Sequence, residues 1–107
     1  MVARRYLGEL ELLILLAIRR LGPEAYGVSI GRAIEAAGGR TVALGSIYAS
    51  LERMEAGGLV ASELGEATAE RGGRAKRYFR MTAEGRGRLA EAQGTLAAMW
   101  QDAAGMA

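Results

Sequence analysis

Residues 44–60 read LGSIYASLERMEAGGLV, a short amphipathic helix followed at once by the start of a strand. Apolar residues at three- and four-residue spacing predict the buried side of this helix, and they are Leu44, Ile47, Leu51 and Met54. The opposite side carries small or polar residues and one basic residue, namely Gly45, Ser46, Ala49, Ser50 and Arg53, with Tyr48 at the boundary. Gly57-Gly58 ends the helix. A helix with so small an outward side can approach another molecule closely.

A nearly all-apolar helix is predicted over residues 8–21, because apolar residues recur at helical spacing from Leu7 to Leu21. Further leucines fill the rest of its surface: Leu12, Leu13, Leu15 and Leu16. A helix that is apolar on most sides needs burial against more than one neighbour. In a chain of 107 residues, we expect a partner subunit to supply the second neighbour.

A second helix is predicted over residues 26–37, between Gly22-Pro23 and Gly38-Gly39, which interrupt helical structure on either side. Gly27 and Gly31 weaken the helix intrinsically. Their presence indicates close packing against another helix.

Two strands and a last helix follow residues 44–58. Residues 59–64 and 75–82 suit an antiparallel hairpin, joined by the polar, glycine-containing stretch 65–73. Thr82 is the expected N-cap of a helix that runs to about residue 103. Three helices, a hairpin and a long helix predict a mainly α (α+β) winged helix-turn-helix fold. We expect a DNA-binding domain over residues 1–82 and a dimerisation helix and tail over residues 83–107.

Basic residues gather on the predicted hairpin, although the formal net charge is only +2. Those we expect to contact DNA are Arg71, Arg74, Lys76 and Arg77. On the third helix the candidates are Ser46, Tyr48, Ser50 and Arg53. The alternatives are a solvated hairpin, an ordinary exposed helix face and a half-buried core tyrosine.

The composition argues against several other classes of protein. The chain has no cysteine and no histidine, so disulfides and thiolate metal sites are excluded and the commonest general base is missing. We therefore expect no enzyme activity, no cofactor and no metal site. The longest apolar run, residues 12–18, falls far short of the roughly 20 residues of a spanning helix. We expect a cytoplasmic protein without membrane association.

Several stretches resemble the PadR family of transcriptional regulators. They are Leu7-Gly8-Glu9-Leu10-Glu11, Ala25-Tyr26-Gly27-Val28, and residues 44–55, 57–60, 70–74 and 77–85. These motifs occur in the family's order and cover about residues 7–89. The resemblance implies a winged helix-turn-helix homodimer. Members are mostly repressors, many of them relieved by small molecules, and the short members dimerise through a single C-terminal helix.

One departure from the family pattern concerns the start of the third helix. Ala43 stands where the family often has a serine that caps the recognition helix. Thr41 is then the nearest candidate for that cap.

The first and last helices predict the dimer interface, with Leu10, Ile14, Leu89, Leu96, Met99 and Trp100. The same seam has an alternative use as a pocket for a small planar apolar effector, formed by Leu96, Met99 and Trp100.

The predicted function is sequence-specific, ligand-responsive repression at a palindromic operator in double-stranded DNA. The alternative is a winged-helix module that binds protein instead of DNA. The concentration of arginines on the hairpin favours DNA.

Overall fold

The structure is a computed structural model of the chain, and it describes residues 5–65 and 75–106, with side chains described as far as Gln101. Its elements are α1 (Glu9–Leu21), the 3-10 turn η1 (Gly22–Glu24), α2 (Gly27–Gly38), α3 (Leu44–Ala56), β1 (Val60–Leu64), β2 (Arg77–Met81) and α4 (Ala83–Met106). Their order confirms the predicted winged helix-turn-helix fold. In the described part of the chain, no helix is long and apolar enough to cross a membrane.

The helix ends are fixed by local hydrogen bonds. At α1, the Gly8 N–H donates to Oε1 of Glu11 at 2.8 Å. At α2, the Tyr26 N–H donates to Oγ of Ser29 at 2.9 Å, and Gly39 ends the helix in the left-handed conformation (φ 74°). At α4, the Gly85 N–H donates to Oγ1 of Thr82 at 3.0 Å, which confirms Thr82 as the N-cap.

The wing is an antiparallel pair of strands, β1 and β2, that runs in register from Val60↔Met81 to Leu64↔Arg77. A single antiparallel bridge pairs Tyr26 with Tyr78 on the other edge of β2. There the Phe79 N–H donates to the carbonyl of Ala25 at 2.9 Å. The wing is thereby attached to the start of α2.

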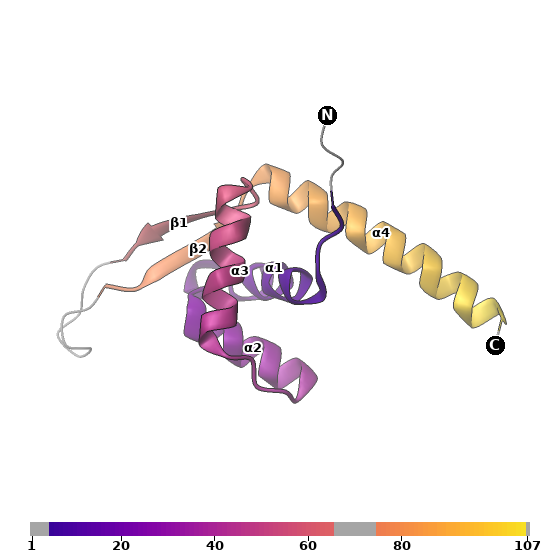
Figure 1. The fold of residues 1–107 in the computed structure, drawn as a ribbon, viewed down its shortest axis with the longest axis horizontal. Helices are drawn as coiled ribbons and strands as arrows, with labels where there is room; N and C mark the ends of the chain where they lie inside the picture. Colours follow the sequence, from indigo (N-terminus) through magenta and orange to yellow (C-terminus); the bar gives the residue numbers. More distant parts are fainter. Residues whose placement is uncertain (1–4, 66–74, 107) are drawn as a thin grey trace.

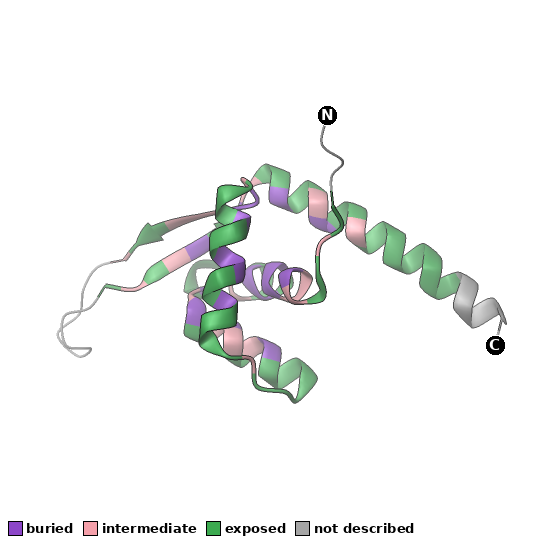
Figure 2. Ribbon diagram, in the orientation of Figure 1, coloured by how far each residue is buried: buried purple, intermediate pink, exposed green. Residues whose placement is uncertain are grey.

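The core lies among α1, α2, α3 and the inner face of the wing (Figures 1 and 2). Its largest fully buried apolar side chains are Ile14, Leu15, Ile30, Ile47, Leu51, Met54 and Val60. Leu89 of α4 is 5% exposed and belongs to the same core. Ile14 and Leu89, both predicted at the dimer interface, pack inside the core of the protomer.

The second half of α4 projects away from the rest of the chain (Figure 1). Described side chains after Ala92 are all exposed (Figure 2). Among them are Leu96 (46% exposed), Met99 (65%) and Trp100 (74%). This half of the helix has an apolar stripe that its own protomer does not cover.

Two residues of α3 lie differently from the prediction. Leu44 is 43% exposed, because it stands at the first position of the helix, beyond the edge of the core. Ser50 is 1% exposed, because the core extends to its side of the helix between Ile47 and Met54. The predictions of a buried Leu44 and an outward Ser50 are wrong.

Candidate nucleic-acid interface

Helices α2 and α3 pack closely through the two glycines that the sequence singled out. A methyl group at Gly27 would lie 2.5 Å from ring atoms of Tyr48, and one at Gly31 would lie 3.0 Å from Cδ1 of Ile47. A side chain at Gly27 would therefore force Tyr48 to move, and one at Gly31 would crowd Ile47. Tyr48 covers Gly27 with its ring while remaining 38% exposed. It is a half-buried packing residue whose outer edge faces solvent.

The outward side of α3 is small, as predicted, except at Ser50. Ser46 and Ala49 are exposed next to Gly45. Arg53 is exposed too, but its guanidinium donates to Oγ of the buried Ser50 at 3.1 Å. This contact satisfies the serine hydroxyl and draws Arg53 back against its own helix.

The N-terminus of α3 has no side-chain cap. Ala43 is the N-cap residue and makes no side-chain hydrogen bond. Thr41 does not replace it, because its hydroxyl donates to the Glu35 carboxylate at the end of α2. The predicted cap by Thr41 is wrong. No acidic residue occupies the first turn of α3, so the positive end of the helix dipole is not neutralised there.

At the base of the wing, cationic side chains are held by neighbours. The Nζ atom of Lys76 lies 4.0 Å from the centroid of the Tyr26 ring, in a cation–π contact. Arg77 donates to Oγ of Ser62 at 3.1 Å, and Ser62 in turn donates to Glu55 of α3 at 2.7 Å. These contacts hold the side chains of Lys76 and Arg77, both predicted to bind DNA, in defined positions. Arg71 and Arg74 lie outside the described residues.

A buried carboxylate joins the N-terminal segment to α1, and the sequence analysis did not identify it. Glu11 is 3% exposed, and Arg5 donates to both of its oxygens at 3.0 and 2.7 Å. The hydrogen bonds from Arg5 lower the pKa of Glu11, although burial raises it; the Gly8 N–H and the charges of Arg5 and Arg53 lower it further. The only sequence signal was a glutamate within an apolar helix, three residues after Gly8.

The same segment also contacts α4. Arg88 donates to the backbone carbonyl of Arg5 at 2.7 Å. Arg88 therefore ties α4 to the N-terminal segment.

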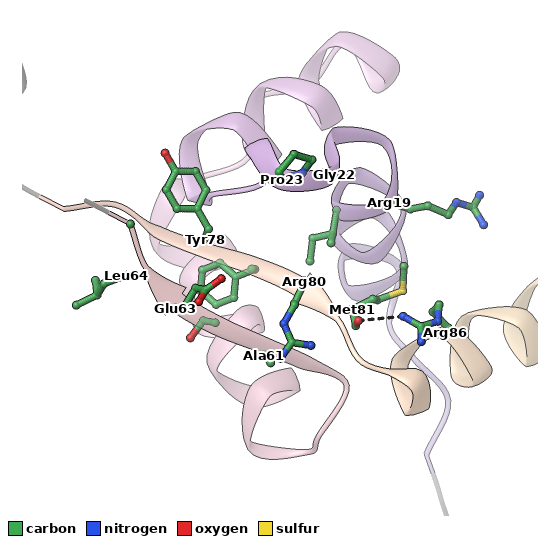
Figure 3. A pocket seen from close by; sticks show the side chains of 14 residues that line it. Arg19, Gly22, Pro23, Ala61, Glu63, Leu64, Tyr78, Arg80, Met81 and Arg86 are labelled. Carbon is green, nitrogen blue, oxygen red and sulfur yellow. Dashed lines mark hydrogen bonds between the residues drawn. The ribbon is translucent and has the colours of Figure 1, made fainter. Parts of the chain in front are cut away.

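An open groove of about 680 Å³ lies on the outer face of the wing sheet, beside the end of α1 (Figure 3). Phe79, Met81 and Pro23 give it apolar surface. Of its arginines, Arg86 donates to the Met81 carbonyl at 3.2 Å, and Arg19 points away from Arg80 (Figure 3). The guanidinium groups thus do not converge on one point.

A second groove, of about 320 Å³, lies between α1 and α4. Its lining is mostly apolar and comprises Leu12, Leu16, Arg19, Leu89, Gln93, Leu96, Ala97 and Trp100. Of the predicted interface residues, the structure brings Leu89, Leu96 and Trp100 together here, whereas Leu10 borders a different hollow, between α1 and α2.

Comparisons with known proteins agree with this architecture. A family described as the transcriptional regulator PadR-like family matches residues 14–91. A PadR-like transcriptional regulator from Bacillus cereus is similar, with 26% identity, 91% of this chain and 89% of that chain covered, and a TM-score of 0.75. A PadR-like transcription factor from Bacteroides fragilis gives 26% identity, 92% and 89% coverage, and the same TM-score. No curated protein gives a significant sequence match.

Proposed function

The chain belongs to the PadR-like family of transcriptional regulators, and on this premise we propose that it is a homodimeric repressor of transcription. In this proposal α3 enters the major groove of double-stranded DNA and the wing contacts the adjacent backbone or minor groove. The observation that carries the proposal is the close-packed pair α2 and α3, with a small, exposed side on α3 and a basic wing beside it.

Each predicted DNA-contacting residue takes a defined part. Ser46 is exposed on α3 and serves as a hydrogen-bond donor to DNA. The hydroxyl of the partly exposed Tyr48 lies against Gly27 at the start of α2 and is proposed to donate to DNA there. Lys76 and Arg77, at the base of the wing, are proposed to contact phosphates. Arg71 and Arg74, which lie between the two strands in the sequence, are proposed to add further phosphate contacts. Arg53 reaches phosphate only if it releases Ser50. Ser50 is left out of the interface, because it is buried.

A second copy of the chain is proposed to cover the exposed apolar stripe of α4. Leu96, Met99 and Trp100 are exposed there, and Leu16 of α1, at 38% exposure, borders the same groove. A partner α4 laid along this groove would bury these side chains around a two-fold axis. Two recognition helices would then meet successive major grooves about 34–36 Å apart, so the operator is proposed to be an imperfect palindrome.

A small planar apolar effector is proposed to act at the same seam, on Leu96, Met99 and Trp100. An aromatic ring can stack on the exposed indole of Trp100 and on its counterpart in the partner. Such a ligand relieves repression only if it prefers one arrangement of the two protomers over the other. Trp100 is the only tryptophan, so quenching of its fluorescence reports this binding directly.

The alternative function, a winged helix that binds protein, is less well supported. It leaves the concentration of arginines in residues 71–77 without a role. A cytoplasmic location follows from the proposed access to DNA.

DNase footprinting on the DNA that flanks the chain's own gene tests the proposal. We expect protection of two half-sites related by a two-fold axis, with two chains bound per duplex. Protection of a single half-site by one chain would contradict the dimeric arrangement. Absence of any protected site, together with no binding to random-sequence duplex, would favour the protein-binding alternative.

A further inference from the structure

Three apolar side chains are exposed on the helix-turn-helix at the place where DNA is proposed to bind. Leu44 (43% exposed) and Tyr48 (38%) are four residues apart and share one face of α3. Val28 (36%) follows Gly27, which contacts the Tyr48 ring. These three residues form what we call the apolar patch. Leu44 stands out because its spacing predicted a place in the core.

The first half of α3 lacks the side chains that usually read bases by paired hydrogen bonds. Residues 44–49 read LGSIYA and contain no asparagine, glutamine, lysine or arginine. Bidentate contacts to guanine or adenine come from those residue types. Ser46 and Tyr48 each offer only a single hydroxyl.

The second half of α3 is unsuited to enter the groove. Glu52 and Glu55 are exposed acids, which phosphates repel, and Glu55 also accepts a hydrogen bond from Ser62. Arg53 is engaged with Ser50. The part of α3 that can meet base edges is therefore its first half, where the apolar patch lies.

Major-groove edges present one apolar group, the C5-methyl of thymine. We propose that this protein reads its operator chiefly through thymine methyl groups, with Leu44 as the specificity-determining residue. Tyr48 and Val28 line the same patch and exclude water around the contact. The inference rests on the proposed DNA binding and adds what the recognition helix selects.

Charge next to the apolar patch favours DNA over an apolar protein partner. Arg32 is exposed on α2, one turn after Val28 and on the same face of that helix. A cation placed beside the patch suits the phosphates that border a major groove.

Replacement of thymine by uracil in DNA removes only the methyl group and provides the test. Duplexes are first enriched from a random library with the full-length protein. Thymines in the enriched sequence are then replaced one at a time by deoxyuridine, and the dissociation constant is measured by fluorescence anisotropy. We expect about a three- to fivefold loss of affinity at each contacted thymine, and no loss at the others.

Variants of Leu44 test whether this residue causes the loss of affinity on uracil substitution. Leu44→Ala should lose the response to uracil at one position in each half-site, whereas Leu44→Met, of similar volume, should retain it. An unchanged circular dichroism spectrum and an unchanged salt dependence of the remaining DNA binding should show that Leu44→Ala is folded and still contacts phosphates.

The other outcomes decide between the two proposals. Enriched duplexes that bind equally well with thymine or uracil would overturn methyl reading and leave DNA binding intact. Equal uracil responses in the wild type and in Leu44→Ala would overturn the role of Leu44. If no duplex is enriched or bound at all, the proposed function fails with it, and the patch is a protein-binding surface.

Discussion

Gly85, in the first turn of α4, lies directly against the backbone carbonyl of Leu59, at the entrance to β1. A methyl group at this position would overlap the carbonyl oxygen of Leu59, which already accepts a hydrogen bond from the Thr82 N–H at 3.1 Å. The Thr82 hydroxyl also donates to the carbonyl of Gly58 at 2.6 Å. The start of α4 is therefore joined tightly to the entrance of the wing, so a change in the packing of α4 in the proposed dimer would be transmitted to the wing.

Gly85→Ala should destabilise the fold by about 1–3 kcal/mol, because the overlapping atom belongs to the backbone and cannot move without breaking hydrogen bonds. Gly87→Ala is the matched control in the same helix, because nothing lies within 4 Å of an added methyl group there. The control should be neutral or more stable by up to about 1 kcal/mol. Urea unfolding measures both, and equal stabilities of the two variants would contradict this account of the joint.

Glu11→Gln should lower the free energy of unfolding at neutral pH by about 1–3 kcal/mol, because it removes a buried charge that accepts hydrogen bonds from Arg5 and Gly8. The pKa of Glu11 is lowered in the folded state. Its contribution is thus fully present above the unfolded pKa of about 4.3, and it is lost as the pH falls through the folded pKa.

Wild-type stability should accordingly fall more steeply than that of Glu11→Gln below about pH 4.3. Glu9→Gln is the control, because Glu9 is 82% exposed and only 4.0 Å from Arg40 in a surface ion pair. Parallel pH profiles for the wild type and Glu11→Gln would show that the carboxylate contributes nothing specific.

Trp100→Ala should weaken the proposed dimer about 30-fold or more, as loss of a buried interface tryptophan commonly costs at least about 2 kcal/mol. Sedimentation analysis over a range of protein concentrations measures the change. Leu64→Ala removes another exposed apolar side chain (62% exposed), on β1 of the wing, and should leave dimerisation unchanged. A wild-type chain that is monomeric at micromolar concentration would rule out this role for α4.

The wing arginines should govern affinity for every duplex. Arg71→Ala and Arg74→Ala should each reduce the dependence of log affinity on log salt concentration by about one unit, because each removes one phosphate contact. Arg53→Ala, which removes a proposed phosphate contact, should reduce binding to the operator and to random sequence by similar factors. Unchanged salt dependence in both wing variants would mean that the wing does not touch DNA.

The sequence predicted most of the fold because the residues that end and cap its helices are easily recognised. Gly22-Pro23, Gly38-Gly39 and Gly57-Gly58 separate the helices where the structure ends them, and Thr82 caps α4. Helical periodicity alone could not place residues at the edge of the core. Ser50 looked like a surface residue, but its small hydroxyl is satisfied by Arg53 and is buried without penalty.

Local sequence patterns could not predict the contacts between segments that lie far apart in the chain. The bridge from Tyr26 to Tyr78 pairs only one residue on each side, so no alternation in the sequence signals it. The pairing of Arg5 with Glu11 depends on how the chain enters α1. An apolar stripe does not say which neighbour covers it, so the sequence could not show that Ile14 and Leu89 pack within the protomer's own core.

Binding of the wild-type chain to a fluorescent duplex across a range of salt concentrations tests the central claim most directly. The account predicts two chains per duplex and a loss of affinity of about 1,000-fold or more between about 50 and 200 mM salt, as expected for six or more phosphate contacts. Affinity that does not change with salt, or no binding at the lowest salt concentration, would contradict it.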